Sequence, residues 1–196
     1  MQLVVKPSQW SLPGLESTSG CFETMRVYRG KIFRLEAHLE RLSASAKYLG
    51  VRLPEPLPRL AQRLIKAVAE SEIPEAIIRV ALIPACAPAC PATPGVGRER
   101  REAGRPNDRR VASTSIVVQP VQLPVPAFYE RGIRVAVVPT RKFPISQIDP
   151  QSKFSARLGS VLATVESQLR HADEAIFLDT MGYVTESTAS NLGIIK

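Results

Sequence analysis

The sequence predicts an α/β fold with two lobes joined by a proline-rich linker. Segments with the alternating pattern of β-strands are interleaved with segments whose apolar residues recur at helical spacing. Near the middle of the 196 residues, Pro120, Pro124 and Pro126 lie within a short stretch and stiffen it. We therefore expect an N-terminal lobe at residues 1–119, a linker at 120–127 and a C-terminal lobe that begins at residue 128 and continues to 196.

The first lobe is expected to contain a strand, a hairpin, two helices and two further strands, in that order. These elements lie at residues 2–6, 21–35, 35–49, 57–71, 76–84 and 112–120. In the hairpin, the turn YRGK separates two β-rich runs. Gly50 provides a stop for the first helix, and prolines bound the second helix on both sides.

The second lobe is expected to contain a strand, a helix and three short closing strands. These elements lie at residues 132–139, 155–170, 174–179, 183–186 and 192–196. The helix carries an apolar stripe that we expect to face inward. This stripe consists of Leu158, Val161, Leu162, Val165 and Leu169. Because ligands usually bind in clefts, we expect the active site between the two lobes.

Composition favours a globular cytoplasmic protein over an exported or membrane-bound one. Apolar residues make up 44% of the chain, which is enough to form a core. No segment approaches the roughly 20 consecutive apolar residues of a membrane helix. The first residues, MQLVVKPSQW, lack a basic segment followed by an apolar run, so we expect no export signal.

Neither a metal site nor a nucleic-acid site is favoured. Cys86 and Cys90 lie four residues apart without further cysteines or histidines nearby to complete a zinc site. The formal net charge is +8, and residues 98–110 hold six arginines against three acidic residues. No aromatic residues are interleaved with these arginines, so a solvated loop is favoured over a nucleic-acid contact.

Lys153 is the first candidate for chemistry, because it directly precedes the helix expected at residues 155–170. A cation is disfavoured near a helix N-terminus, and burial in a cleft would lower the pKa of the amine further. A neutral amine is the form that attacks a carbonyl group. The alternative is an ordinary solvated lysine.

Glu186 and Arg41 are the other two candidates. By strand alternation, Glu186 shares a core-facing side with Val184, where a carboxylate needs a partner. The small polar residues STASN that follow would let backbone amides approach a ligand, although they also fit a plain turn. Arg41 lies at the edge of the apolar helix face and has no acidic residue four positions away, so its guanidinium could bind a phosphate.

The two histidines are not favoured as catalysts. His38 lies on the seam of the first helix together with Leu35 and Leu42, and we interpret it as a packed core histidine. His171 is expected in a turn after the last helix.

Three blocks of the sequence resemble the class IV, or fold type IV, pyridoxal-phosphate enzymes. The blocks are GCFETMRVYRGKIFRLEAHLERLSASAKYLGV at residues 20–51, SKFSARLGSVLATVES at 152–167 and ADEAIFLDTMGYVTESTASNLGIIK at 172–196. This family includes branched-chain aminotransferases, D-amino acid aminotransferases and 4-amino-4-deoxychorismate lyase. The resemblance implies a small N-terminal α/β sandwich and a C-terminal β-barrel-like lobe. That second lobe is expected to be incomplete here, since family members are longer.

The resemblance also implies a cofactor, pyridoxal 5'-phosphate, and a role for each candidate residue. Lys153 would hold the cofactor covalently and move the Cα proton of the substrate. Glu186 would hydrogen-bond the pyridine nitrogen, and Arg41 would bind the phosphate. The implied cofactor-binding residues are Arg41, Lys153, Glu186, Ala189, Ser190 and Asn191. A small-molecule amino acid substrate and a homodimer are further expectations from the resemblance.

Two features bear on the reaction. Branched-chain aminotransferases resemble one another in a tyrosine five residues after the lysine, where this chain has Leu158. The run K-x-x-x-R-L at 153–158 looks closest to aminodeoxychorismate lyase, which eliminates pyruvate to give 4-aminobenzoate for folate synthesis. We therefore expect a lyase. The alternatives are an amino acid aminotransferase, of branched-chain or D-amino acid type, and a non-catalytic remnant of the fold.

Overall fold

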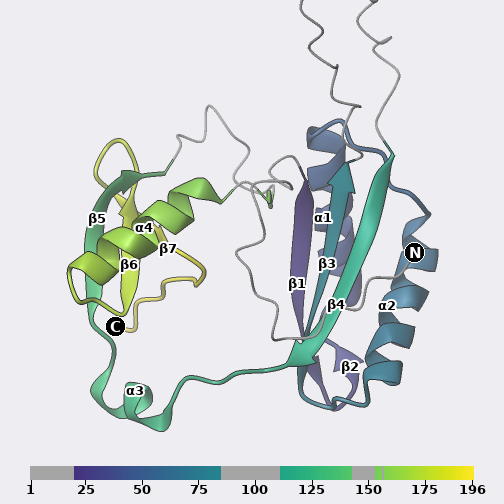
Figure 1. The fold of residues 1–196 in the computed structure, drawn as a ribbon, viewed down its shortest axis with the longest axis horizontal. Helices are drawn as coiled ribbons and strands as arrows, with labels where there is room; N and C mark the ends of the chain where they lie inside the picture. Colours follow the sequence, from purple (N-terminus) through teal and green to yellow (C-terminus); the bar gives the residue numbers. More distant parts are fainter. Residues whose placement is uncertain (1–19, 85–110, 143–152, 156) are drawn as a thin grey trace, which may run out of the picture. The chain divides into compact units, whose positions relative to one another are not determined.

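In the computed structural model, the described residues are 20–84, 111–142, 153–155 and 157–196 (Figure 1). The strand expected at 2–6, both Cys86 and Cys90, and the arginine-rich run at 98–110 lie outside these ranges. The chain divides into two units. The first comprises residues 1–121 and 151–155, and the second comprises 122–150 and 156–196.

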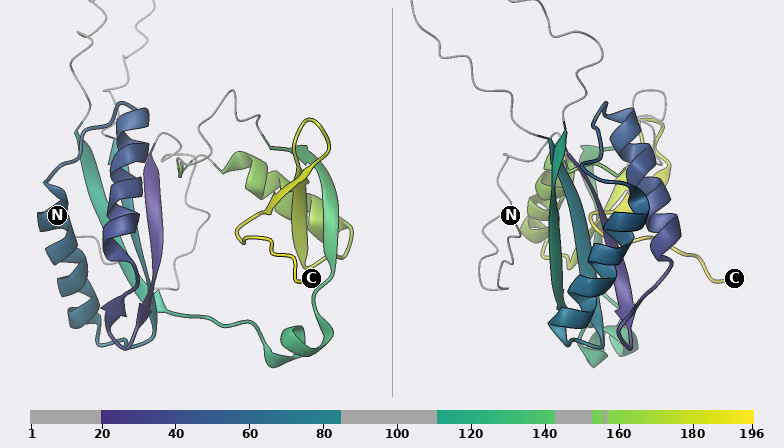
Figure 2. Two further views of the ribbon diagram at one scale, coloured as in Figure 1. Left: turned by 180° about the vertical axis from the view of Figure 1, so that it is seen from behind. Right: turned by 90° about the vertical axis from the view of Figure 1, so that its right-hand side faces the viewer.

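The first unit is a four-stranded antiparallel sheet with two helices on one face (Figure 1 and Figure 2). The strands follow the order β2-β1-β3-β4. Its elements are β1 (Cys21–Tyr28), β2 (Lys31–Ile32), α1 (Leu35–Tyr48), α2 (Leu57–Ser71), β3 (Ala76–Pro84) and β4 (Ala112–Pro120). These bounds confirm the hairpin, both helices and both long strands that the sequence predicts for residues 21–120.

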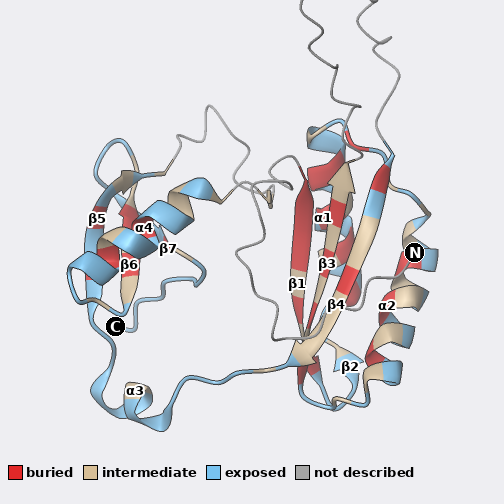
Figure 3. Ribbon diagram, in the orientation of Figure 1, coloured by how far each residue is buried: buried red, intermediate tan, exposed pale blue. Residues whose placement is uncertain are grey.

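Alternation along the strands decides which side chains enter the core of the first unit. In β1, Cys21, Met25 and Val27 are buried and belong to one core cluster with residues of both helices. Buried residues are red in Figure 3. Leu42 and Leu64 meet them from α1 and α2, and both are fully buried. Burial of one such leucine side chain stabilises a fold by about 1.5–3 kcal/mol. The apolar stripes of both helices therefore hold this sheet from one side.

The segment that carries Lys153 joins the edge of β1 in the first unit. Phe154 pairs with Cys21 in an antiparallel bridge. The amide of Phe22 donates to the carbonyl of Lys153 at 3.2 Å, and the amide of Ser155 donates to the carbonyl of Gly20 at 2.8 Å. Although the sequence analysis assigns residue 153 to the C-terminal lobe, its backbone therefore packs with the N-terminal unit.

The second unit is a small sheet with strand order β5-β6-β7. Its elements are α3 (Pro126–Arg131), β5 (Val135–Arg141), α4 (Leu158–Leu169), β6 (Glu174–Leu178) and β7 (Val184–Ser187). Strands β5 and β6 are parallel, and α4 lies between them in sequence as the crossover helix that parallel strands require. Residues 126–131 form a helix that begins with a proline, where the sequence predicts the end of the linker at 127 and no element before the strand at 132–139.

The strand predicted at residues 192–196 is wrong. These residues have no strand or helix assignment, and Ile195 is fully exposed. A strand needs a neighbouring edge to hydrogen-bond with, and within the second unit these residues pair with none. The apolar residues of this segment suggested a strand, but they did not show which other strand it would pair with.

The predicted inward face of α4 is also wrong. The buried residues of this helix are Ala163 and Ser167. The predicted inward residues are exposed, at 43–77% of their surface, and they are Leu158, Val161, Leu162, Val165 and Leu169. Small side chains let the helix approach β5 and β6 closely, and the cluster that it buries is limited to Val138, Ala163, Ala175 and Phe177. The helical periodicity showed that large apolar residues form a stripe along α4, but it did not show which face of the helix packs on the sheet.

Among the helices in the described ranges, none combines the length and apolarity required to span a membrane.

Candidate functional site

A buried ion cluster joins β1 to α1 in the first unit. The carboxylate of Glu23 is fully buried. Arg41 donates to it from Nε and from Nη2, each at 2.6 Å, and Nδ1 of His38 lies 2.8 Å from the same carboxylate. The two nitrogens of Arg41 and the imidazole ring of His38 together satisfy a buried negative charge that would otherwise be costly.

Local structure explains why these three side chains meet. Glu23 lies opposite Val80 of β3 and on the same side of β1 as Cys21 and Met25, so it points toward the helices. His38 and Arg41 lie three residues apart on α1 and therefore share one face of that helix. The strand thus supplies the acidic partner of Arg41 that the helix sequence lacks.

Glu23 is not among the residues predicted from the sequence, and the prediction for His38 is wrong. The signal for Glu23 was present, because a charged residue occupies an inward position in an otherwise apolar alternation. His38 is a member of the ion cluster and not a packed apolar histidine; its side chain is 22% exposed. The alternation of β1 indicates that Glu23 needs a partner but not which one, since its contacts with α1 join residues at least 15 positions apart.

Electrostatics within the cluster favour an ionised carboxylate. Burial alone would raise the pKa of Glu23, but hydrogen bonds from Arg41 and His38, and the charges of Arg41 and Lys153, outweigh it and lower that pKa. The hydrogen bond to Glu23 in turn raises the pKa of Arg41. Burial, with the nearby Glu23 charge, raises the pKa of the Cys21 thiol to about 11. At neutral pH, Glu23 and Arg41 therefore form an ion pair.

This cluster predicts a loss of stability in acid. Because the pKa of Glu23 is lower in the folded protein than its ordinary value of 4.5, its contribution is present above that value and is lost as pH falls through the folded pKa. We expect the melting temperature of the wild type to fall more steeply below pH 4.5 than that of Glu23→Gln. Thermal unfolding followed by circular dichroism from pH 3 to pH 7 measures both curves. Parallel curves would contradict the assigned ionisation.

Lys153 lies near the same cluster. Its charge is one of those that lower the pKa of Glu23. Its backbone amide donates to Oγ of Ser45, one turn beyond Arg41 on α1, at 3.1 Å. Its Nζ lies 5.4 Å from the ring centroid of Phe22. The structure therefore places two of the predicted site residues in the first unit: Arg41 binds Glu23, and the charge of Lys153 acts on the same carboxylate.

Lys153 lies too far from a helix N-terminus for the dipole of α4 to act on its amine. Helix α4 begins at Leu158, five residues beyond the lysine, and not at residue 155. Helix dipole effects fade within the first turn, so this helix is not a reason for a neutral amine. The lysine is half-buried and lies above the aromatic ring of Phe22.

Glu186 belongs to the second unit, and its predicted core-facing position is wrong. Its side chain is 48% exposed, and Val184 is exposed as well. Ser187 is the buried residue of β7. The carboxylate of Glu186 forms an ion pair with Lys142, whose Nζ also lies 4.8 Å from the ring centroid of Phe177. The first three residues of the short strand are exposed and only Ser187 is buried, so the strand does not show the alternation that the sequence suggested.

The residues after Glu186 form a turn that is closed by its own hydrogen bonds. The amide of Ser190 donates to Oγ of Ser187 at 2.9 Å, and that hydroxyl donates to the carbonyl of Ser190 at 2.9 Å. Oγ1 of Thr188 donates to Glu174 at 2.6 Å. Ala189 lies within this turn and Asn191 directly follows it, and both are exposed. Within this turn, the Ser190 amide already has a partner in its own segment.

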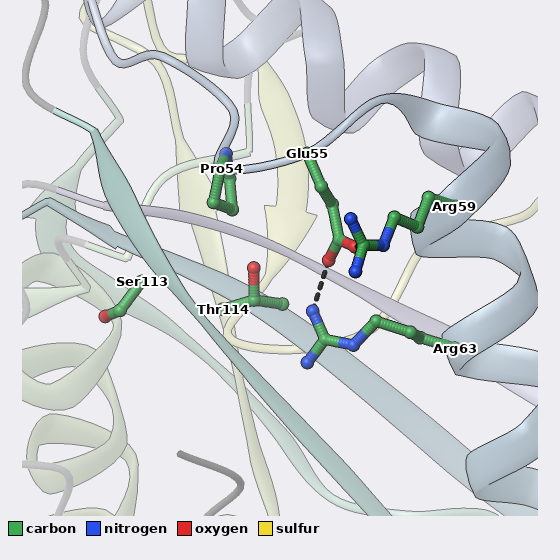
Figure 4. A pocket seen from close by; sticks show the side chains of 6 residues that line it. All are labelled: Pro54, Glu55, Arg59, Arg63, Ser113 and Thr114. Carbon is green, nitrogen blue, oxygen red and sulfur yellow. Dashed lines mark hydrogen bonds and ion pairs between the residues drawn. The ribbon is translucent and has the colours of Figure 1, made fainter.

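An open pocket of about 400 Å³ lies elsewhere in the first unit (Figure 4). In it, Glu55 forms ion pairs with Arg59 and Arg63. The pocket is lined by Pro54, Glu55, Arg59, Arg63, Ser113 and Thr114. None of the predicted site residues lines it. Within the described ranges, no three His, Cys, Asp or Glu side chains are grouped as a metal site would require.

Comparison with known proteins gives one family. Residues 20–196 match the family described as amino-transferase class IV. A protein of Methanocaldococcus jannaschii, named for branched-chain-amino-acid aminotransferase activity, is 31% identical over 186 residues, which are 93% of this chain and 58% of that protein. The D-alanine aminotransferase of Listeria monocytogenes is 28% identical over 183 residues, covering 93% of this chain and 58% of that enzyme.

A solved structure gives the same result for the fold. The branched-chain aminotransferase of Thermoproteus uzoniensis, crystallised with norvaline, is 27% identical and superimposes with a TM-score of 0.67. The match covers 94% of this chain and 60% of that enzyme. This chain thus spans about three-fifths of the length of these relatives, which agrees with the expected incomplete second lobe. The names of these relatives favour the aminotransferase alternative over the lyase that the sequence analysis preferred.

Proposed function

The chain belongs to the class IV aminotransferase family, and we propose that it binds pyridoxal 5'-phosphate and acts in amino acid transamination, with branched-chain amino acids as the first substrate class. The observation that supports this most is that Arg41 binds the buried carboxylate of Glu23 in the same unit in which the backbone of Lys153 packs on β1 and α1, with the charge of Lys153 acting on that carboxylate. The similarity to the Methanocaldococcus jannaschii protein supports the substrate class.

The side chains of the first unit fit the chemistry of such a cofactor. Arg41 is held by one edge and is 45% exposed, so it can still bind a phosphate group. Lys153 supplies an amine for covalent attachment and for moving a proton at the substrate Cα. The positive charges of both residues exceed the single negative charge of Glu23, so this region attracts an anion.

When bound, pyridoxal phosphate supplies an electron sink for the bonds at the amino acid Cα. Glu186 would hydrogen-bond the pyridine nitrogen of the cofactor and keep it protonated. In the second unit this carboxylate is ionically paired with Lys142 and accessible, so it can accept a further hydrogen bond. The cytoplasmic location and the homodimer expected from the resemblance are parts of the same proposal.

A product assay tests the proposed reaction. We expect the protein with added pyridoxal phosphate to convert L-leucine and 2-oxoglutarate to 4-methyl-2-oxopentanoate and glutamate. D-Alanine in place of L-leucine tests the D-amino acid alternative, for which the Listeria relative is the reason. Release of pyruvate and 4-aminobenzoate from aminodeoxychorismate without a 2-oxo acid would contradict the proposal and would support the lyase reaction instead.

The remaining alternative is a non-catalytic relative that keeps the fold. It predicts no visible absorption after pyridoxal phosphate is added and no turnover with any of these substrates. Absorption in the visible range that survives gel filtration would exclude it.

A further inference from the structure

We infer that Glu23 is a positioning residue for phosphate recognition: it holds the guanidinium of Arg41 by one edge and thereby presents the other edge to the phosphate of the cofactor. This inference rests on the proposed function. It adds a residue that carries no role in the resemblance described above, and it gives that residue a measurable effect on ligand selectivity.

Glu23 binds only one of the two edges of the Arg41 guanidinium. A guanidinium has a side edge, formed by Nε and one terminal nitrogen, and an end edge, formed by both terminal nitrogens. Glu23 occupies the side edge, since Nε and Nη2 of Arg41 each donate to one carboxylate oxygen at 2.6 Å. Within the described ranges, no hydrogen bond involves Nη1, and Nη2 has, besides its bond to Glu23, only a long contact of 3.4 Å with Nδ1 of His38. The end edge is therefore the one that remains for a bidentate contact with a phosphate.

Glu23 and Arg41 differ in how far their side chains are buried. The Glu23 side chain is fully buried, whereas that of Arg41 is 45% exposed. The carboxylate is thus a fixed anchor, and the arginine reaches from it toward solvent. A free arginine side chain loses considerable rotamer entropy when it binds an anion. An arginine that is already held in one orientation loses less, so its affinity for the anion is higher.

His38 strengthens the anchor. Its Nδ1 lies 2.8 Å from Oε2 of Glu23, the oxygen that also accepts from Nη2 of Arg41. A third hydrogen-bonding group fixes the carboxylate plane, and therefore the plane of the guanidinium that pairs with it. The cluster is rigid because each of its members is attached to a packed strand or helix.

The sign of the effect separates positioning from simple charge balance. Glu23 is negative, so by charge alone it weakens the attraction of Arg41 and Lys153 for a phosphate. If charge balance were its role, Glu23→Gln would tighten phosphate binding. If Glu23 positions Arg41, the same substitution weakens phosphate binding, because the amide of glutamine cannot accept both hydrogen bonds from the guanidinium.

The test compares pyridoxal phosphate with pyridoxal, which lacks the phosphate. Each is incubated with the full chain and reduced with borohydride, and labelling of the peptide that contains Lys153 is quantified by mass spectrometry over a concentration series. For Glu23→Gln we expect the half-saturating concentration of pyridoxal phosphate to rise about tenfold, and that of pyridoxal to stay within twofold. In an Arg41→Lys background, we expect Glu23→Gln to cause no further loss.

Three results would overturn the inference. They are unchanged or tighter labelling by pyridoxal phosphate, an equal loss for both ligands, and a full additional loss in the Arg41→Lys background. An equal loss would mean that Glu23 acts only through general stability. If Glu23→Gln does not fold, Glu23→Asp replaces it. That variant keeps the charge but is one methylene shorter, and we expect it to raise the half-saturating concentration selectively for pyridoxal phosphate.

Inorganic phosphate provides an arm that is independent of Lys153. We expect 10 mM phosphate to raise the melting temperature of the wild type at constant ionic strength and to leave that of Glu23→Gln unchanged. If Lys153 of the wild type is not labelled but this phosphate effect is seen, the proposed function is refuted, and the role of Glu23 in phosphate recognition still stands. Absence of both labelling and the phosphate effect would overturn the inference together with the proposed function.

Discussion

Replacement of Lys153 by alanine is expected to lower the rate of transamination by at least about 10³-fold. The reason is that one amine both attaches the cofactor and moves the Cα proton, and loss of a positioned general base alone costs about 10²–10⁴-fold. The measurement is kcat/KM for L-leucine with 2-oxoglutarate at saturating pyridoxal phosphate. Visible absorption of the protein–cofactor mixture after gel filtration should disappear as well.

A matched control for this prediction lies on α2. The side chain of Lys66 is 74% exposed and pairs with Glu70 four residues further along the same helix. Lys66→Ala removes the same functional group and should change kcat/KM by less than twofold, since exposed pairs contribute little to stability. Turnover of Lys153→Ala within tenfold of the wild type would refute the catalytic role of this lysine.

Replacement of Glu186 by alanine is expected to lower kcat by about 10³-fold. A carboxylate at the pyridine nitrogen keeps the ring protonated, and the electron sink depends on that positive charge. Glu186→Gln should be similarly impaired, because a neutral amide does not favour a protonated pyridine. Single-turnover kinetics with L-leucine measure the step at Cα directly.

The exposed position of Glu186 makes this experiment easy to interpret. Its side chain is 48% exposed and that of its partner Lys142 is 33% exposed, so breaking the pair should change the free energy of unfolding by no more than about 1 kcal/mol. The melting temperature of Glu186→Ala should therefore stay close to that of the wild type. A variant with an unchanged melting temperature and near-normal turnover would remove Glu186 from the site.

The sequence predicted the first unit well because several local signals agree there. The turn YRGK, Gly50 and the prolines around α2 mark where elements end, and the apolar residues between them have a clear period. Each helix of this unit also has one apolar face only. The local sequence pattern and the tertiary packing therefore place the ends of these helices and strands at nearly the same residues.

The second unit was predicted less well because its packing depends on contacts that local pattern does not contain. Helix α4 has both a stripe of large apolar residues and a stripe of small ones, and the small residues Ala163 and Ser167 are the ones that meet the sheet. The four-residue strand β7 is too short for its alternation to fix which side is buried. Residues 192–196 are apolar, but no strand of this unit pairs with them.

The candidate site shows the same division. Arg41 and Lys153 were proposed as site residues from the sequence, since a family resemblance is carried by residue types along the chain, and their roles stay predictions. Glu23 was missed, because its importance comes from contacts with a helix 15 and 18 residues away. The structure added the anchor that explains how Arg41 is held.

The most direct test of the proposed chemistry is to locate the attachment site of the cofactor. The protein is treated with pyridoxal phosphate, reduced with borohydride and digested, and the modified peptide is sequenced by mass spectrometry. We predict a single dominant modification on Lys153 at substoichiometric cofactor. Modification spread over exposed lysines such as Lys66, with none at Lys153, would contradict the proposed role.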